Sequence, residues 1–335
     1  MSFMARPAAG GFTGCDIAVA HFDSPYVSVY PWSSGFGSKY ADPATLPNDI
    51  GLGVAFSPSG QDIAVAHDVS PFISVYPWRA GFGAKYSNPS TLPTGSGNSV
   101  AFSPSGEAIA VAHGSSPFVS AYPWNAGFGT KYANPATLPT GEGLGVTFLP
   151  SGSDIAVSHA TSPFVSAYPW SSGFGTKYSD PATLPTGTGL GIAFSPSGAD
   201  IAVAHGSSPF ISAYPWSAGF GTKYANPATL PSASGFGVAF SPSGADIAVA
   251  HAASPFVSAY PWNAGFGTKY ANPATLPTGP GYSVAFSPSG FDIAVTHDFS
   301  PFVSVYSWNA GFGTKYANPA TLPSEVCYSV AWKAP

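Results

Sequence analysis

The sequence predicts an all-β protein: a seven-bladed β-propeller with four-stranded antiparallel blades, whose ring closes when the C-terminal strand pairs with the N-terminal blade. Three observations predict it. A histidine recurs every 46 residues without insertion or deletion, each unit holds four short apolar runs, and the chain starts and ends out of phase with its units. Such a period indicates a unit that buries its apolar face only by stacking on its neighbours. The repeated histidines are His21, His67, His113, His159, His205, His251 and His297.

Residues 51 to 93 show the elements of one repeat. Runs rich in Val, Ile, Phe and Tyr are separated by SPSG, by Ser-Pro and by glycine-rich stretches, which is typical of strands and turns. The last run leads into Asn-Pro and Leu-Pro. Because proline lacks the N–H that a ladder needs, we place this strand at the outer edge of the sheet. The expected strands are Gly53–Phe56, Asp62–His67, Phe72–Trp78 and an outer strand near Gly83–Ser87.

The two ends of the chain predict how the ring closes. Residues Asp16–His21 match the second strand of a repeat, but no first strand precedes them. Residues Tyr328–Trp332 match a first strand, but no second strand follows. Each is therefore expected to pair with the other. The expected boundaries are an N-terminal arm at 1–14, one propeller domain at 15–335, and a closing blade made from 15–47 and 327–333.

The repeated motifs resemble a known family. VAFSPSG, IAVAH, SPFVSAYPW and TKYANPATLP are similar to the WD40-like propeller repeats of phage and bacterial proteins, and the resemblance covers residues 15 to 333. The sequence departs from that pattern, because Ser replaces the Asp of SPDG and no Asp follows the tryptophan. The hydrogen-bonded tetrad of the family therefore does not carry over intact. The resemblance implies a binding scaffold rather than an enzyme, although a fold alone fixes no function.

Composition excludes several classes of partner and ligand. Only 7% of the residues are charged, the net charge is −5, and no Lys/Arg cluster is present, so we expect no nucleic-acid partner. No apolar run is long enough for a membrane span, and residues 1 to 14 lack the apolar core of a signal peptide. Histidines on separate blades lie too far apart to share a metal ion. We therefore expect no metal and no cofactor.

The other repeated polar residues have structural interpretations. Each histidine is expected to form a hydrogen bond within its own blade, near the end of the second strand. An aspartate precedes that strand in every copy except the third, which has Ala108, so a turn or cap role is expected for it. Trp78, Tyr76 and their equivalents either pack between blades or stack on sugars. Cys15 and Cys327 fall at opposite ends of a strand pair, too far apart for a disulfide, and are expected to be free thiols.

The copies differ most in two loops that emerge on one face of the disc: the loop after each histidine and the loop before each first strand. The opposite face is expected to be monotonous. On the varied face, apolar residues rimmed by carboxylates gather in one sector and predict a surface for binding a protein partner. Neutral drift in exposed loops is the alternative. The predicted partner-binding residues are Phe22, Asp23, Asp49, Ile50, Asp68, Val69, Asp298, Phe299, Glu325 and Val326.

These observations predict a non-enzymatic structural and interaction protein. The expected role is a bacteriophage virion component, either a capsid decoration or a tail-associated protein, with a virion location. Its expected partners are other protein subunits, bound through the varied loop face and the N-terminal arm, with a glycan as a further candidate. A multivalent carbohydrate-binding lectin is the alternative. An enzyme with a site in the central channel is the weaker one, because the sequence offers no convergent set of acid, base or metal ligands.

Overall fold

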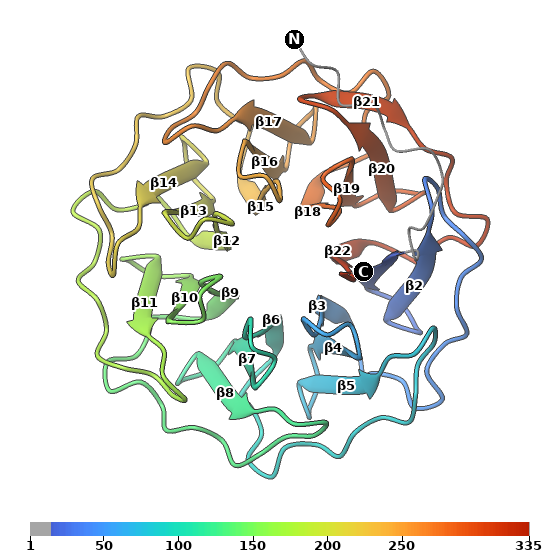
Figure 1. Cartoon of the computed structure of the whole chain (residues 1–335), viewed down its shortest axis with the longest axis vertical. Coiled ribbons are helices and arrows are strands. Elements are labelled where there is room, and N and C mark those ends of the chain that lie inside the picture. Colours follow the sequence, from blue (N-terminus) through green and yellow to red (C-terminus); the bar gives the residue numbers. More distant parts are fainter. Residues whose placement is uncertain (1–14, 335) are drawn as a thin grey trace.

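The computed structural model describes residues 15–334, and the strands in this range form seven antiparallel sheets arranged around a central axis, as in a seven-bladed β-propeller (Figure 1). The first sheet, blade 1, contains β1 (Cys15–His21), β2 (Val27–Trp32) and β22 (Cys327–Trp332). Blades 2 to 4 contain β3 (Gly51–Phe56), β4 (Asp62–His67), β5 (Ile73–Pro77); β6 (Gly97–Phe102), β7 (Ala108–His113), β8 (Val119–Pro123); and β9 (Gly143–Phe148), β10 (Asp154–His159), β11 (Val165–Pro169). Blades 5 to 7 contain β12 (Gly189–Phe194), β13 (Asp200–His205), β14 (Ile211–Pro215); β15 (Gly235–Phe240), β16 (Asp246–His251), β17 (Val257–Pro261); and β18 (Gly281–Phe286), β19 (Asp292–His297), β20 (Val303–Trp308), β21 (Phe312–Lys315).

The core consists of interfaces between neighbouring blades. The second strand of each blade is buried on both faces, one bulky and one small. Ile63 and Val65 of β4 pack against Ala18 and Ala20 of β1, and the same arrangement repeats around the disc. Fully burying a side chain such as Ile or Val contributes roughly 1.5–3 kcal/mol. The alternation of bulky and small residues in the sequence therefore sets how closely adjacent blades approach.

The C-terminal strand joins the first blade, as the out-of-phase ends of the chain predict. β22 pairs antiparallel with β1, with Val330 opposite Val19. Cys327 lies opposite His21 at the end of β1, whereas Cys15 begins that strand, so the two thiols are at opposite ends of it. The predicted N-terminal arm, residues 1–14, lies outside the described residues.

The prediction of four-stranded blades is correct for one blade among the described residues. Blades 1 to 6 have three strands, and in each the outer segment is reduced to a single β-bridge, such as Trp78 to Phe82. In these blades a proline occupies the third-strand position whose backbone faces the outer segment. In blade 2, for example, the carbonyl oxygen of Pro77 accepts a hydrogen bond from Gly83 N at 2.8 Å. Proline has no N–H to return that bond. Blade 7 has Ser307 at this position, and there β21 forms a fourth strand.

The histidines hold their own blades together, as expected. Nε2 of His21 lies 3.0 Å from Oγ of Ser28 on the neighbouring strand, and an equivalent pair occurs in every blade. Every one of these imidazoles is inaccessible to solvent. Burial lowers the pKa of each from 6.5 to about 4. A neutral, buried His–Ser pair repeated in this way is structural rather than a hydrolytic dyad, which needs access to substrate.

Candidate functional site

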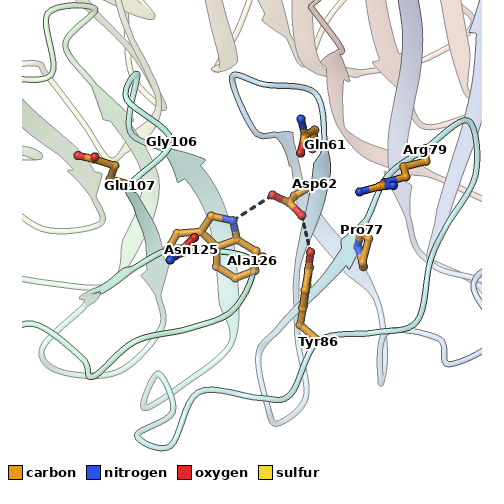
Figure 2. Close-up of a pocket in the computed structure, with 10 residues that line it drawn as sticks. Gln61, Asp62, Pro77, Arg79, Tyr86, Gly106, Glu107, Asn125 and Ala126 are labelled. Atoms are coloured by element: carbon orange, nitrogen blue, oxygen red, sulfur yellow. Dashed lines mark hydrogen bonds between the residues drawn. The ribbon is translucent and has the colours of Figure 1, made fainter.

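A pocket of about 620 Å³ opens between blades 2 and 3, on the face that carries the SPSG turns (Figure 2). Four polar side chains at its edge come from corresponding places in the two blades. Gln61 and Glu107 precede the second strands, β4 and β7, while Arg79 and Asn125 follow the third-strand tryptophans. The remaining lining residues are Asp62, Pro77, Tyr86, Gly106, Trp124 and Ala126.

Backbone hydrogen bonds fix these positions in pairs. In blade 2, Trp78 N donates to Gln61 O at 2.6 Å, which places Arg79 beside Gln61. In blade 3, Trp124 N donates to Glu107 O at 2.8 Å and places Asn125 beside Glu107. The repeat therefore supplies a rigid frame, and the identity of each side chain decides the chemistry of the pocket.

The carboxylate of Asp62 lines the pocket. Its Oδ1 accepts a hydrogen bond from Tyr86 OH at 2.9 Å, and its Oδ2 accepts one from Trp124 Nε1 at 3.0 Å, as the dashed lines in Figure 2 show. Desolvation, followed by the hydrogen bond to Asp62 and its charge, raises the pKa of Tyr86 to about 12, while the charge of Arg79 opposes that rise. Asp62 thus has both oxygens engaged and joins two blades, so we do not assign it the role of a base.

The same bridge links most neighbouring blades, and this corrects the turn or cap role expected for the repeated aspartates. The backbone N–H of Asp62 does take part in the turn, donating to Ser57 Oγ at 3.0 Å. Its carboxylate instead joins the tyrosine of its own blade to the tryptophan of the next. The tryptophans are buried in this network, so among the alternatives left open by the sequence the structure favours packing between blades over stacking on sugars.

The polar edge of the pocket departs from the repeat, and the expectation that this face is monotonous is wrong. The residues at the position of Arg79 in the other copies are Ser33, Asn125, Ser171, Ser217, Asn263 and Asn309. The residues at the position of Gln61 and Glu107 are Cys15, Ser153, Ala199, Ala245 and Phe291. Charged side chains of both signs therefore line the pocket at this junction. Aligning the copies at these two positions would have found the site.

The predicted partner-binding residues lie on the opposite face, where the structure brings some of them together in pairs within blades 1 and 2. Phe22 N donates to Val326 O at 3.0 Å, and Asp68 N donates to Ile50 O at 3.2 Å. Asp49 Oδ1 accepts from the N–H of Ile50 at 2.8 Å. The two predicted loops are therefore in contact.

Other features of the predicted residues are their exposure, their contacts with the histidines and the effect of their charge on two tyrosines. Phe22, Val69 and Phe299 are exposed. The backbone oxygens of Asp23 and Phe299 accept from His21 Nδ1 and His297 Nδ1. After desolvation, the charge of Asp298 raises the pKa of both Tyr282 and Tyr328, and Glu325 adds to the effect on Tyr328. The binding of a partner to this surface stays a prediction.

Two further observations concern other kinds of site. In residues 15–334, no three His, Cys, Asp or Glu side chains gather in a way that could hold a metal ion. Over the same range, no helix has the length and apolar character needed to cross a membrane.

Comparisons with known proteins find the fold in solved structures. No family model matches this chain, and no curated protein matches it. A candidate 6-phosphogluconolactonase of Bacteroides uniformis superposes with a TM-score of 0.71 at 14% identity, covering 95% of this chain and 99% of that one. The periplasmic gluconolactonase of Pseudomonas aeruginosa gives 0.71 at 15% identity, covering 96% and 99%. A protein of Lactobacillus plantarum gives 0.74 at 13% identity, covering 96% and 99%.

These likenesses correct the functional expectation. At such low identity they show the fold alone, and that fold is shared with proteins named as lactonases. The expected non-enzymatic virion scaffold is contradicted by these enzyme neighbours. The propeller part of the family resemblance is supported, whereas its WD40 and phage context is not, and the virion location has no support. The resemblance misled because strand and turn motifs report how a blade is built, while function depends on side chains at its edges.

Proposed function

We propose that this protein is a hydrolase that opens a sugar-derived lactone in the pocket between blades 2 and 3. The observation that carries the proposal is that Arg79, Glu107, Gln61 and Asn125 line one pocket, and that the remaining copies have no charged residue at the positions of Arg79 and Glu107. The volume of about 620 Å³ lies within the usual range of small-molecule sites. The lactonase names of the fold neighbours supply the substrate class.

Arg79 is assigned the role of stabilising the negative charge that develops in this reaction. Water attacks the ester carbonyl of the ring, an oxyanion develops on the carbonyl oxygen, and the ring C–O bond then breaks to leave a carboxylate and a hydroxyl group. A guanidinium group presents N–H donors to an oxyanion, and also to a phosphate or carboxylate carried by the substrate. Figure 2 shows Arg79 reaching from the end of β5 toward the pocket, on the side opposite Glu107.

Glu107 is assigned as the base that takes a proton from the attacking water. In Figure 2 its carboxylate points away from Asp62, so this role requires a different side-chain rotamer. Glu107 is exposed, and exposed side chains change rotamer on the picosecond to nanosecond timescale. The amides of Gln61 and Asn125 offer both donors and acceptors, which suits the hydroxyl groups of a sugar.

The test is proton release during hydrolysis of glucono-δ-lactone and of 6-phosphogluconolactone, measured in weak buffer against the spontaneous rate. We expect catalysis of at least one of the two, with Arg79→Ala and Glu107→Gln each lowering kcat/KM about a hundredfold. A preference for the phosphorylated substrate that Arg79→Ala abolishes would assign Arg79 to the phosphate. Asn263→Ala changes the position equivalent to Arg79 in blade 6 and is expected to leave the rate unchanged. Hydrolysis at the spontaneous rate, or equal rates in all four proteins, would refute the proposal.

A further inference from the structure

The junction between blades 3 and 4 lacks the carboxylate that bridges the other junctions. At the remaining junctions an aspartate accepts from a tyrosine of its own blade and from the tryptophan of the next, as Asp200 does from Tyr224 OH at 2.7 Å and Trp262 Nε1 at 3.1 Å. In blade 3 the corresponding residue is Ala108. The two donors that would face a carboxylate here are Tyr132 OH and Trp170 Nε1.

Both donors keep the arrangement that they have around an aspartate. The rings of Tyr132 and Trp170 are 5.3 Å apart at 90°, against 5.3 Å and 87° for Tyr224 and Trp262. Trp170 is 8% exposed, so more than nine-tenths of it is buried. Within residues 15–334, no residue accepts a hydrogen bond from its Nε1. The two rings therefore keep their spacing without the carboxylate, and no other group of residues 15–334 takes its place.

The charge nearest to this junction is that of Glu107, which precedes Ala108. After desolvation, Glu107 is the second cause of the raised pKa of Tyr132, so its charge is felt there. Its carboxylate makes no hydrogen bond to either donor. Because Glu107 is exposed, solvent screens its repulsion of a bound anion, which weakens such a ligand without excluding it.

We propose that the junction between blades 3 and 4 is a binding site for the carboxylate group of a small ligand, held by Trp170 Nε1 and Tyr132 OH. The indole N–H of Trp170 and the phenol O–H of Tyr132 stand where the equivalent donors at the other junctions share one carboxylate, so they can donate to the two oxygens of one acceptor. Formate, which has the heavy atoms of the missing group, is the smallest probe, and acetate is larger by one methyl group. This site does not depend on lactone hydrolysis.

The experiment follows the indole N–H resonances of the ¹⁵N-labelled protein during titration with sodium formate, with sodium chloride at matched ionic strength as the reference. The Trp170 resonance is assigned by its loss in Trp170→Phe. We expect it to shift and saturate at millimolar formate, with little response to chloride. In Ala108→Asp, the internal carboxylate should occupy the site and make the Trp170 resonance insensitive to formate. In Glu107→Gln, the midpoint should move to lower formate concentration, because a repulsive charge is removed.

Asp200→Ala provides a matched positive control, since it removes the carboxylate between blades 5 and 6 and should make the Trp262 resonance respond to formate. If Trp262 responds in that variant while Trp170 of the unaltered protein does not, the proposal fails. It also fails if chloride shifts Trp170 as strongly as formate does. A response that appears only in Glu107→Gln would show that Glu107 itself fills the place in solution, which likewise overturns the proposal.

Discussion

Nε1 of Trp32 donates a hydrogen bond to Oδ2 of Asp292 at 3.1 Å and so joins blade 1 to blade 7 across 260 residues of sequence. Tyr316 OH donates to the other oxygen of Asp292 at 2.7 Å. This buried tyrosine–aspartate–tryptophan bridge supplements the apolar contact between blades with directional bonds to a charged acceptor. Such bonds are individually stronger than those between neutral groups. The remaining bridges have Asp16, Asp62, Asp154, Asp200 and Asp246 as acceptors.

Removing one bridge should destabilise the protein. Asp200→Ala leaves Tyr224 OH and Trp262 Nε1 without their acceptor, and we expect the free energy of unfolding to fall by about 3 kcal/mol. Urea denaturation monitored by tryptophan fluorescence measures this change. Asp42→Asn removes an exposed carboxylate that pairs with Lys39 and should change the free energy by less than about 0.5 kcal/mol. Equal effects of the two substitutions would contradict the importance of the bridge.

Restoring the missing bridge should have the opposite effect. Ala108→Asp places a carboxylate between Tyr132 and Trp170, and we expect an increase of about 1 kcal/mol in the free energy of unfolding, because two donors gain an acceptor. The control is Ala199→Asp, which adds the same charge at an exposed position one residue before Asp200. At that position the new carboxylate has no tyrosine–tryptophan pair of its own to accept from. A gain that is no larger than that of the control would show that the donors of blades 3 and 4 do not accommodate a carboxylate.

Acid should unfold the protein through its histidines. Their pKa falls from 6.5 to about 4 on folding, so between these values the unfolded chain binds protons that the folded chain does not. The contribution of the neutral histidines to stability is therefore complete above pH 6.5 and declines as the pH drops toward 4. Each histidine contributes up to about 1.4 kcal/mol per pH unit in that window.

The urea midpoint should accordingly decrease steeply from pH 7 to pH 5. His205→Gln removes one titrating group, so the proton uptake on unfolding near pH 5 should be smaller by one proton. This uptake is obtained from the slope of the unfolding free energy against pH. An unchanged midpoint between pH 7 and pH 5 would contradict burial of the neutral imidazoles.

The residue at the end of the third strand should control the fourth strand. Ser307→Pro removes an N–H that faces β21, so we expect the backbone amides of residues 312–315 to exchange with deuterium faster. Pro215→Ser makes the reverse change in blade 5 and should slow exchange in residues 220–223. Hydrogen–deuterium exchange followed by mass spectrometry measures both segments. Unchanged exchange in both variants would show that another feature limits the outer strand.

Much of the fold was predictable because its signals are local. The second strand could be recognised from Ile63, Val65 and the alanines between them, and the alternation of bulky and small residues indicated that both faces are covered. The outer strand was over-predicted because the aromatic and glycine pattern of 83–87 looks extended. What limits it is a missing N–H on the adjacent strand, a consequence of pairing that no single segment displays.

The candidate site was missed for a related reason. Arg79 and Glu107 are 28 positions apart in the sequence, and each looks like an isolated surface charge. They share a pocket because blade 3 stacks on blade 2 and brings the start of β7 near the end of β5. The loop residues were predicted instead because their variation is visible along the chain, whereas the placement of side chains from two blades around one pocket is not.

The sequence by itself determined the number of blades, their order and the pairing of β22 with β1, since a strict repeat and one displaced strand permit few other arrangements. Only the tertiary structure decided what the repeated aspartates do, which side chains share a pocket, and that Ala108 leaves Tyr132 and Trp170 without the carboxylate that the other junctions have. These features depend on contacts between successive blades. A repeat specifies each blade internally, but the chemistry at a junction arises from two copies that differ, and their relative placement follows only from packing.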